Sequence, residues 1–197
     1  MFLNTFPIRR LIGSLALAVG LVASAAGFST ADAQGAKLKA TPPVLVTSIG
    51  RSLDAFQVQL VVKRMGVDFK YDPVADSDSL GNAKTLILAV GASLKGFGDA
   101  GITIKDELAR TTKILDVAKA KGLYVILVHL GGEDRRDALS NQLIDLVGPR
   151  SQYIIIRDDS DADKMFTNIS KTANIPMVVI DGPDTLKPQL DKIFAAG

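Results

Sequence analysis

The chain of 197 residues contains no cysteine and a single histidine, His129. Without cysteine no disulfide can form, so the packed core must hold the fold together. A lipoprotein anchor needs a cysteine at its cleavage site and is excluded for the same reason. A zinc site built from several histidine or cysteine ligands is excluded within one chain. We therefore expect no metal site.

A strong excess of one charge is also missing. Lys and Arg together number 23, Asp and Glu number 21, and the formal net charge is +2. Proteins that bind nucleic acid through its phosphates need a basic surface. The balanced charge therefore argues against nucleic acid, and against an anionic membrane surface, as the main partner.

The N-terminal residues show the pattern of a secretory signal peptide. Arg9 and Arg10 precede an apolar run from Leu11 to Phe28, and Ala31-Asp32-Ala33 places small residues at a cleavage site. We expect residues 1–33 to be removed, which leaves no stable membrane anchor and an exported protein, periplasmic or secreted. Because such a protein meets little NAD(P) or ATP, we expect no cofactor.

A polar lead-in at residues 34–43, expected to be flexible, is followed by alternating strand and helix patterns. Nearly continuous β-branched runs predict buried strands at Val44–Ser48, Val67–Tyr71, Thr85–Val90, Tyr124–His129, Tyr153–Ile156 and Met177–Ile180. Apolar residues at helical spacing predict helices at Leu53–Met65, Ile104–Lys121, Asp137–Val147, Ala162–Ala173 and Thr185–Phe194. The first two helices have Ser52 and Thr103 as expected N-caps and Gly66 and Gly122 as expected ends.

This alternation predicts a parallel sheet, because each crossover must return the chain to the same edge. Right-handed crossovers then place helices on both faces. We expect residues 44–197 to form a single doubly wound α/β domain with a mainly parallel sheet of about six strands. The expected type is flavodoxin-like or Rossmann-like, with the second strand outside the first.

In such sheets, ligands bind beyond the carboxyl ends of the strands, where the strand order reverses. The loop after the first strand opens a helix, and its glycine permits a tight turn beside free backbone N–H groups. The loop after the third strand has four glycines among residues 91–101, which would let the backbone wrap closely around a ligand. The alternatives are a plain helix cap with a solvated arginine, and a flexible surface loop. The predicted ligand-binding residues of these two loops are Ser48, Gly50, Arg51, Ser52, Gly91, Ser93, Lys95 and Gly96.

The loop after the fourth strand begins with the only histidine and continues with two glycines and four charged residues. Its two arginines can form bidentate hydrogen bonds with a carboxylate or a phosphate. Its glutamate can accept a hydrogen bond from a ligand or orient the histidine. The alternative is that the acidic residues start a helix and pair with the arginines at the surface. The predicted ligand-binding residues here are His129, Gly131, Gly132, Glu133, Arg135 and Arg136.

Two other patterns carry less weight. The acidic run at residues 158–163 fails as a calcium loop, because Lys164 stands where glycine is required and Ser170 where glutamate is required. We expect it to cap a helix. No G-x-S-x-G elbow is present, so a triad from Ser48 or Ser93 with His129 and Glu133 would need the fold to bring these residues together.

Three motifs at Thr47–Ala55, Val90–Ile102 and His129–Asn141 together resemble a family of small exported bacterial α/β domains of unknown function. The resemblance covers nearly all of the chain after the signal peptide. It implies the α/β fold and the importance of these loops, but no reaction. The residues that match the family pattern are Ser48, Gly91, Ser93, Lys95, Gly131, Gly132, Glu133, Arg135 and Arg136.

Three functions remain open at this point. The first is an exported binding module for a small anionic molecule that carries a carboxylate or a phosphate. The second is a cofactor-independent hydrolase or transferase that uses His129 and Glu133. The third is an interaction domain whose loops dock a transporter or another envelope protein.

Overall fold

The computed structural model describes residues 39–196, so the predicted signal peptide and residues 34–38 of the lead-in lie outside the described part. The described residues form one six-stranded sheet with the order β2-β1-β3-β4-β5-β6, and every pair of neighbouring strands is parallel. This order confirms the predicted flavodoxin-like arrangement, with the second strand outside the first. The strands are β1 (Val44–Ile49), β2 (Phe69–Tyr71), β3 (Thr85–Val90), β4 (Tyr124–His129), β5 (Tyr153–Arg157) and β6 (Met177–Ile180).

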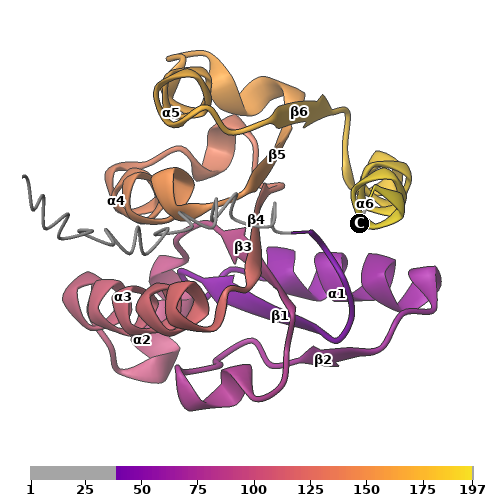
Figure 1. The fold of residues 1–197 in the computed structure, drawn as a ribbon. Helices are drawn as coiled ribbons and strands as arrows, with labels where there is room; N and C mark the ends of the chain where they lie inside the picture. The colour runs from indigo at the N-terminus through magenta and orange to yellow at the C-terminus, as the bar shows by residue number, and fades with distance from the viewer. Residues whose placement is uncertain (1–38, 197) are drawn as a thin grey trace, which may run out of the picture. The chain divides into compact units, whose positions relative to one another are not determined.

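Helices cover both faces of the sheet (Figure 1). Successive strand residues point to opposite faces, so Leu45 packs in the core on one side and Val44 and Val46 in the core on the other. The helices are α1 (Asp54–Met65) and α6 (Leu186–Ala195) over one face, and α3 (Ile104–Lys121), α4 (Ala138–Val147) and α5 (Met165–Ala173) over the other. Within residues 39–196, no helix has the length and hydropathy needed to cross a bilayer.

Local sequence signals set most helix ends. Thr103 accepts the Asp106 amide while the Asp106 side chain returns to the Thr103 amide, which is the capping box of α3. Gly66 and Gly122 end their helices at φ 71° and 66°. The α5 helix starts at Met165, three residues later than predicted, because Lys164 takes the left-handed conformation at φ 63°. The predicted acidic cap is confirmed, since Asp161 Oδ1 accepts the Phe166 amide at 2.8 Å.

The glycine-rich stretch after β3 is not the long loop that its composition predicts. Residues Leu94–Ala100 form a short helix, α2, in which Phe97 is buried. Ser93 caps it by accepting the Gly96 amide at 3.1 Å, and Gly101 ends it at φ 63°. The high glycine content predicted a loop. A cap at each end and one buried aromatic residue nevertheless suffice for a helix of two turns.

Two glycines of α2 provide a test of this helix. Gly98 has ordinary helical φ, and a Cβ built on it meets nothing within 4 Å among the described residues. We expect Gly98→Ala to raise the free energy of unfolding by about 0.5–1 kcal/mol in urea titrations, because alanine is the better helix former. Gly96→Ala should instead destabilise, since its Cβ would lie 2.7 Å from the Arg51 carbonyl oxygen. Equal and negligible effects of both changes would indicate a mobile loop.

The end of the lead-in belongs to the packed domain, in contrast to its predicted flexibility. Ala40 is buried in the core over the α1 face. The Thr41 backbone exchanges two hydrogen bonds with the Thr85 hydroxyl, at 2.9 and 2.8 Å. The Pro43 carbonyl accepts the Lys84 amide at 2.8 Å. Turn-forming composition alone suggested a tether, but these distant backbone partners fix residues 40–43 against β3.

Candidate functional site

The three loops singled out by the sequence converge at the carboxyl edge of the sheet. Arg51 and Ala92 form an isolated bridge between the loops after β1 and β3, and the Ser93 amide donates to the Gly50 carbonyl at 2.8 Å. The Ala92 amide donates to the Ser140 hydroxyl at the start of α4, at 2.9 Å. The parallel topology thus brings these loops together as expected.

The glycines of the first two loops allow the backbones of these loops to pack closely against each other. Gly50 has φ 101°, and a Cβ built on it would lie 2.6 Å from the Gly91 carbonyl carbon and 2.9 Å from Ala92 Cα. A Cβ on Gly96 would lie 2.7 Å from the Arg51 carbonyl oxygen. The point where strand order reverses is therefore closed by backbone packing rather than wrapped around an open space.

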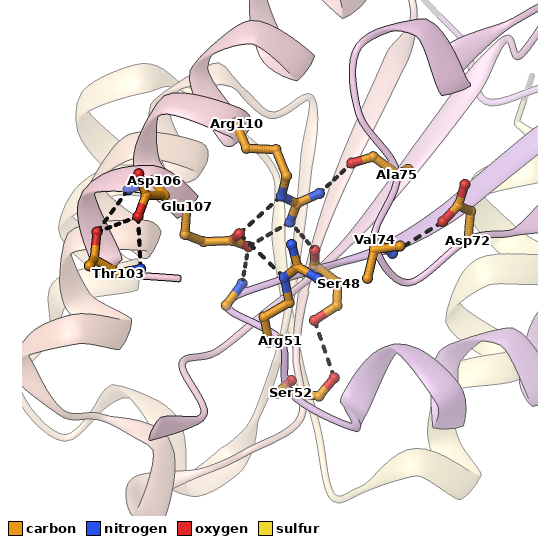
Figure 2. Close-up of polar contacts among 11 residues, drawn as sticks. Ser48, Arg51, Ser52, Asp72, Val74, Ala75, Thr103, Asp106, Glu107 and Arg110 are labelled. Atoms are coloured by element: carbon orange, nitrogen blue, oxygen red, sulfur yellow. Dashed lines mark hydrogen bonds and ion pairs between the residues drawn. The ribbon is translucent and has the colours of Figure 1, made fainter. Parts of the chain in front are cut away.

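A buried carboxylate on α3 holds this closed arrangement (Figure 2). Glu107 is fully buried and accepts the Gly50 amide at 2.7 Å. It also accepts from Arg110 Nε at 3.0 Å and Arg110 Nη2 at 2.5 Å, and Arg51 Nε lies 3.6 Å from it. Arg110 donates in addition to the carbonyls of Ser48, at 2.6 Å, and of Ala75. Glu107 thus joins α3 to the β1 loop, and Arg110 extends the connection to the β2 loop.

The pKa of Glu107 reflects this environment. Burial alone would raise the pKa, but the hydrogen bond and charge of Arg110, the Gly50 amide and the charge of Arg51 together hold it below its ordinary value. The side chain is therefore ionised, and the cluster of Arg51, Glu107 and Arg110 carries one net positive charge.

Sequence reasoning missed Glu107 and Arg110. Both lie within a long helix, where charged residues usually face solvent. The available signal is the spacing of Glu107, Thr111, Ile114 and Ala118, all buried, which places a carboxylate on the core-facing stripe of α3. A charge on such a stripe requires a buried partner.

Several predicted ligand-binding residues have local partners instead. The Ser48 hydroxyl donates to the Ser52 carbonyl at 3.2 Å, and the Ser93 hydroxyl caps α2. Lys95 projects outward with 82% of its side chain exposed and pairs with Asp99 at 2.6 Å. Arg51 has φ 62° and turns toward Glu107, although its buried Nε lacks a hydrogen-bond partner in the described part of the chain.

His129 is completely buried at the end of β4. Its Nδ1 lies 2.7 Å from the Val90 carbonyl oxygen and its Nε2 3.4 Å from that of Gly132, while its ring packs against Phe166. Burial lowers the pKa of His129, more than its two carbonyl partners raise it. No hydrogen bond links His129 to Ser48, Ser93 or Glu133 within residues 39–196, so the conceivable triad is not assembled here.

The two adjacent arginines of the β4 loop have different surroundings. Arg136 donates to Asn141 at 3.0 Å, to Asp163 at 2.7 Å and to the Ser160 carbonyl, and it lies over the Phe166 ring. These contacts fix the loop to the α5 side. Arg135 is only partly exposed, and its buried Nη1 has no hydrogen-bond partner among the described residues.

Gly131 lies beside the stem of Arg135 and beside a second side chain, Asp54, that has an unpartnered atom in the described residues. A Cβ built on Gly131 would overlap Cβ and Cγ of Arg135 and would lie 3.4 Å from Asp54 Oδ2. A Cβ on Gly91 would lie 3.6 Å from Asp54 Oδ2 and 3.8 Å from the Ser52 hydroxyl oxygen. Asp54 Oδ2 therefore lies near both glycines, with the Ser52 hydroxyl beside Gly91 and the stem of Arg135 beside Gly131. We call these five residues the Asp54–Arg135 site. Sequence reasoning missed Asp54, which reads as an ordinary acidic residue in the first turn of a helix.

Two predicted residues remain, Gly132, which is buried, and Glu133. Gly132 has φ 61°, and a Cβ there would overlap the Arg157 guanidinium, which pairs with Asp159 at 2.5 Å. Glu133 is exposed. In the described range, no group of three or more His, Asp or Glu side chains is arranged to hold a metal ion.

Comparison with known proteins gives a family but no activity. Neither a search of curated proteins nor a search of solved structures found a match. The model of the family described as "Domain of unknown function (DUF6305)" matches residues 41–194, which is nearly the whole described domain. The chain therefore belongs to the DUF6305 family.

Proposed function

We propose that this domain binds a small molecule carrying a carboxylate or a phosphate at the Asp54–Arg135 site, with Arg135 as the main contact. One observation carries the proposal. Arg135 Nη1 is buried and has no hydrogen-bond partner in residues 39–196. A buried charged donor without an acceptor is costly, and a carboxylate or phosphate would satisfy it with a charge-assisted hydrogen bond.

The position of Arg135 supports this assignment. The residue follows β4 at the carboxyl edge, where ligands of doubly wound sheets bind. The neighbouring cluster of Arg51, Glu107 and Arg110 adds one net positive charge at the same edge, which favours an anion. The proposal includes export, with the protein acting outside the cytoplasm after loss of residues 1–33.

The enzymatic alternative receives less support from the geometry. A general base must reach the proton it removes, and both nitrogens of His129 face backbone carbonyls. Glu133 stands apart from them on the surface. The third hypothesis, a domain that docks an envelope protein, stays a prediction.

An anion screen tests the proposal directly. We expect inorganic phosphate, or one of acetate, succinate and citrate, to raise the melting temperature of the wild type in a dose-dependent way. Arg135→Gln should weaken that binding by roughly ten- to a hundredfold, the worth of one hydrogen bond to a charged group. The melting temperature of the ligand-free variant should change little, because Arg135 Nη1 has no partner within residues 39–196 to lose.

Arg150→Gln is the matched control. Arg150 is a half-exposed arginine that pairs with Asp116 and lies before β5, at the opposite end of the sheet. This variant should bind the same anion as tightly as the wild type. Absence of any anion effect, or equal binding by Arg135→Gln, would refute the proposal.

A further inference from the structure

We infer that the ligand of this site is a zwitterion, with an ammonium group that Asp54 binds and a carboxylate or phosphate that Arg135 binds. The inference rests on the proposed function and narrows it to one ligand class. It adds a residue, Asp54, that the anion-binding proposal does not need.

One oxygen of the Asp54 carboxylate is buried and lacks a donor in the described part of the chain. Asp54 is the first residue of α1, only 6% of its surface is exposed, and Oδ2 has no hydrogen-bond partner among residues 39–196. Its own amide donates to the Ser52 hydroxyl at 3.3 Å, so the backbone at this position is fixed. The helix dipole stabilises a carboxylate here in general, but it does not supply a donor to Oδ2. A buried carboxylate oxygen without a donor requires one from elsewhere.

Asp54 and the stem of Arg135 approach the same glycine without forming an ion pair in the described residues. Both approach Gly131 from the side on which its Cβ would point, with Oδ2 3.4 Å from that position and the Arg135 stem overlapping it. The described part of the chain nevertheless contains no ion pair within 4.0 Å between them. The Asp54 Oδ2 atom and the stem of Arg135 therefore lie on the same side of Gly131, and each side chain has one buried polar atom without a partner in residues 39–196.

The chemistry of this pair selects the ligand. An ammonium group supplies three donors and the positive charge that a buried carboxylate favours. A carboxylate or phosphate supplies the acceptors that a guanidinium favours. A small molecule with both groups a few bonds apart, such as an α-amino acid or an aminoalkyl phosphate, would satisfy both side chains. A simple anion would satisfy only Arg135.

Matched ligand pairs test this prediction in titration calorimetry. The probes are alanine against propionate, glutamate against glutarate, and phosphoethanolamine against ethyl phosphate, which differ within each pair by the ammonium group. In the wild type, the ammonium-bearing member of at least one pair should bind at least tenfold more tightly than its partner. In Asp54→Asn this ratio should fall to about one, while the partner without the ammonium group keeps its affinity.

Asp72→Asn is the control, because Asp72 is a carboxylate that follows β2 at the same edge and pairs with Lys70 at 3.6 Å. It should keep the wild-type ratio. The wild-type ratio alone tests the inference even if Asp54→Asn does not fold. Equal binding within every pair, with loss of both members in Arg135→Gln, would overturn the inference and leave the anion-binding function standing. Absence of binding by all six probes and by the simple anions would overturn both.

Discussion

Glu107→Ala is expected to lower the free energy of unfolding by about 3–5 kcal/mol, the usual result of removing one partner from a buried ion pair. The change would leave the guanidiniums of Arg51 and Arg110 without their shared carboxylate. It would also remove the acceptor of the Gly50 amide. Urea denaturation followed by circular dichroism measures the loss. Asp116→Ala on the same helix removes an exposed pair with Arg150, and it should cost no more than about 1 kcal/mol.

The same residue predicts a dependence of stability on pH. Because the pKa of Glu107 in the folded protein lies below its ordinary value of 4.5, the unfolded chain binds this proton more tightly than the folded chain. The contribution of Glu107 should be fully present above about pH 4.5 and should be lost as the pH falls through the folded pKa. Glu107→Gln should remove that part of the acid sensitivity. An unchanged pH profile in this variant would show that the carboxylate is not held as described.

Gly50→Ala is expected to cost about 3 kcal/mol or more, from backbone strain and overpacking together. Its φ of 101° disfavours any side chain, and the new Cβ would overlap the backbone of Gly91 and Ala92. Relief requires the loops after β1 and β3 to separate, which breaks the hydrogen bond from Ser93 to Gly50. The free energy of unfolding from urea titrations is the measurement.

Gly66→Ala separates the two causes of this loss. Gly66 also has a positive φ, 71°, but in the described structure a Cβ there meets nothing within 4 Å. It should show only the left-handed penalty of about 1–2 kcal/mol. The excess loss in Gly50→Ala then measures the contact between the loops. Equal losses in the two variants would contradict the close packing of these loops.

Most of the fold could be predicted because its signals are local. The buried strands are nearly continuous β-branched runs, and the alternation with helices determines a parallel sheet. The main miss in the fold is α2, whose glycines have low helix propensity although Ser93 and Gly101 supply both ends. The burial of Phe97 in the core favours the helical conformation of this segment. Such packing cannot be recognised from a short stretch of sequence.

The candidate site was predictable only as a region. Topology brings the three loops to one edge, and that part of the prediction is confirmed. Which side chains remain without partners depends on contacts between distant residues. Arg136 reaches Asp163 on a segment 27 residues away, and Glu107 reaches Gly50 across 57 residues. These contacts distinguish Arg135 from its neighbour and give Glu107 its role, and neither is encoded in a local motif.

The hydrogen-bonded loops after β1 and β3 also bear on the energetics of recognition. Their backbones are joined to each other and to a carboxylate on α3, so this part of the proposed site would need no ordering when a ligand binds. The conformational entropy lost on association would then come mainly from the ligand and from the few rotatable bonds of the Arg135 side chain. Even a ligand of few atoms can therefore retain most of its interaction energy as affinity, which suits a site formed around a single glycine.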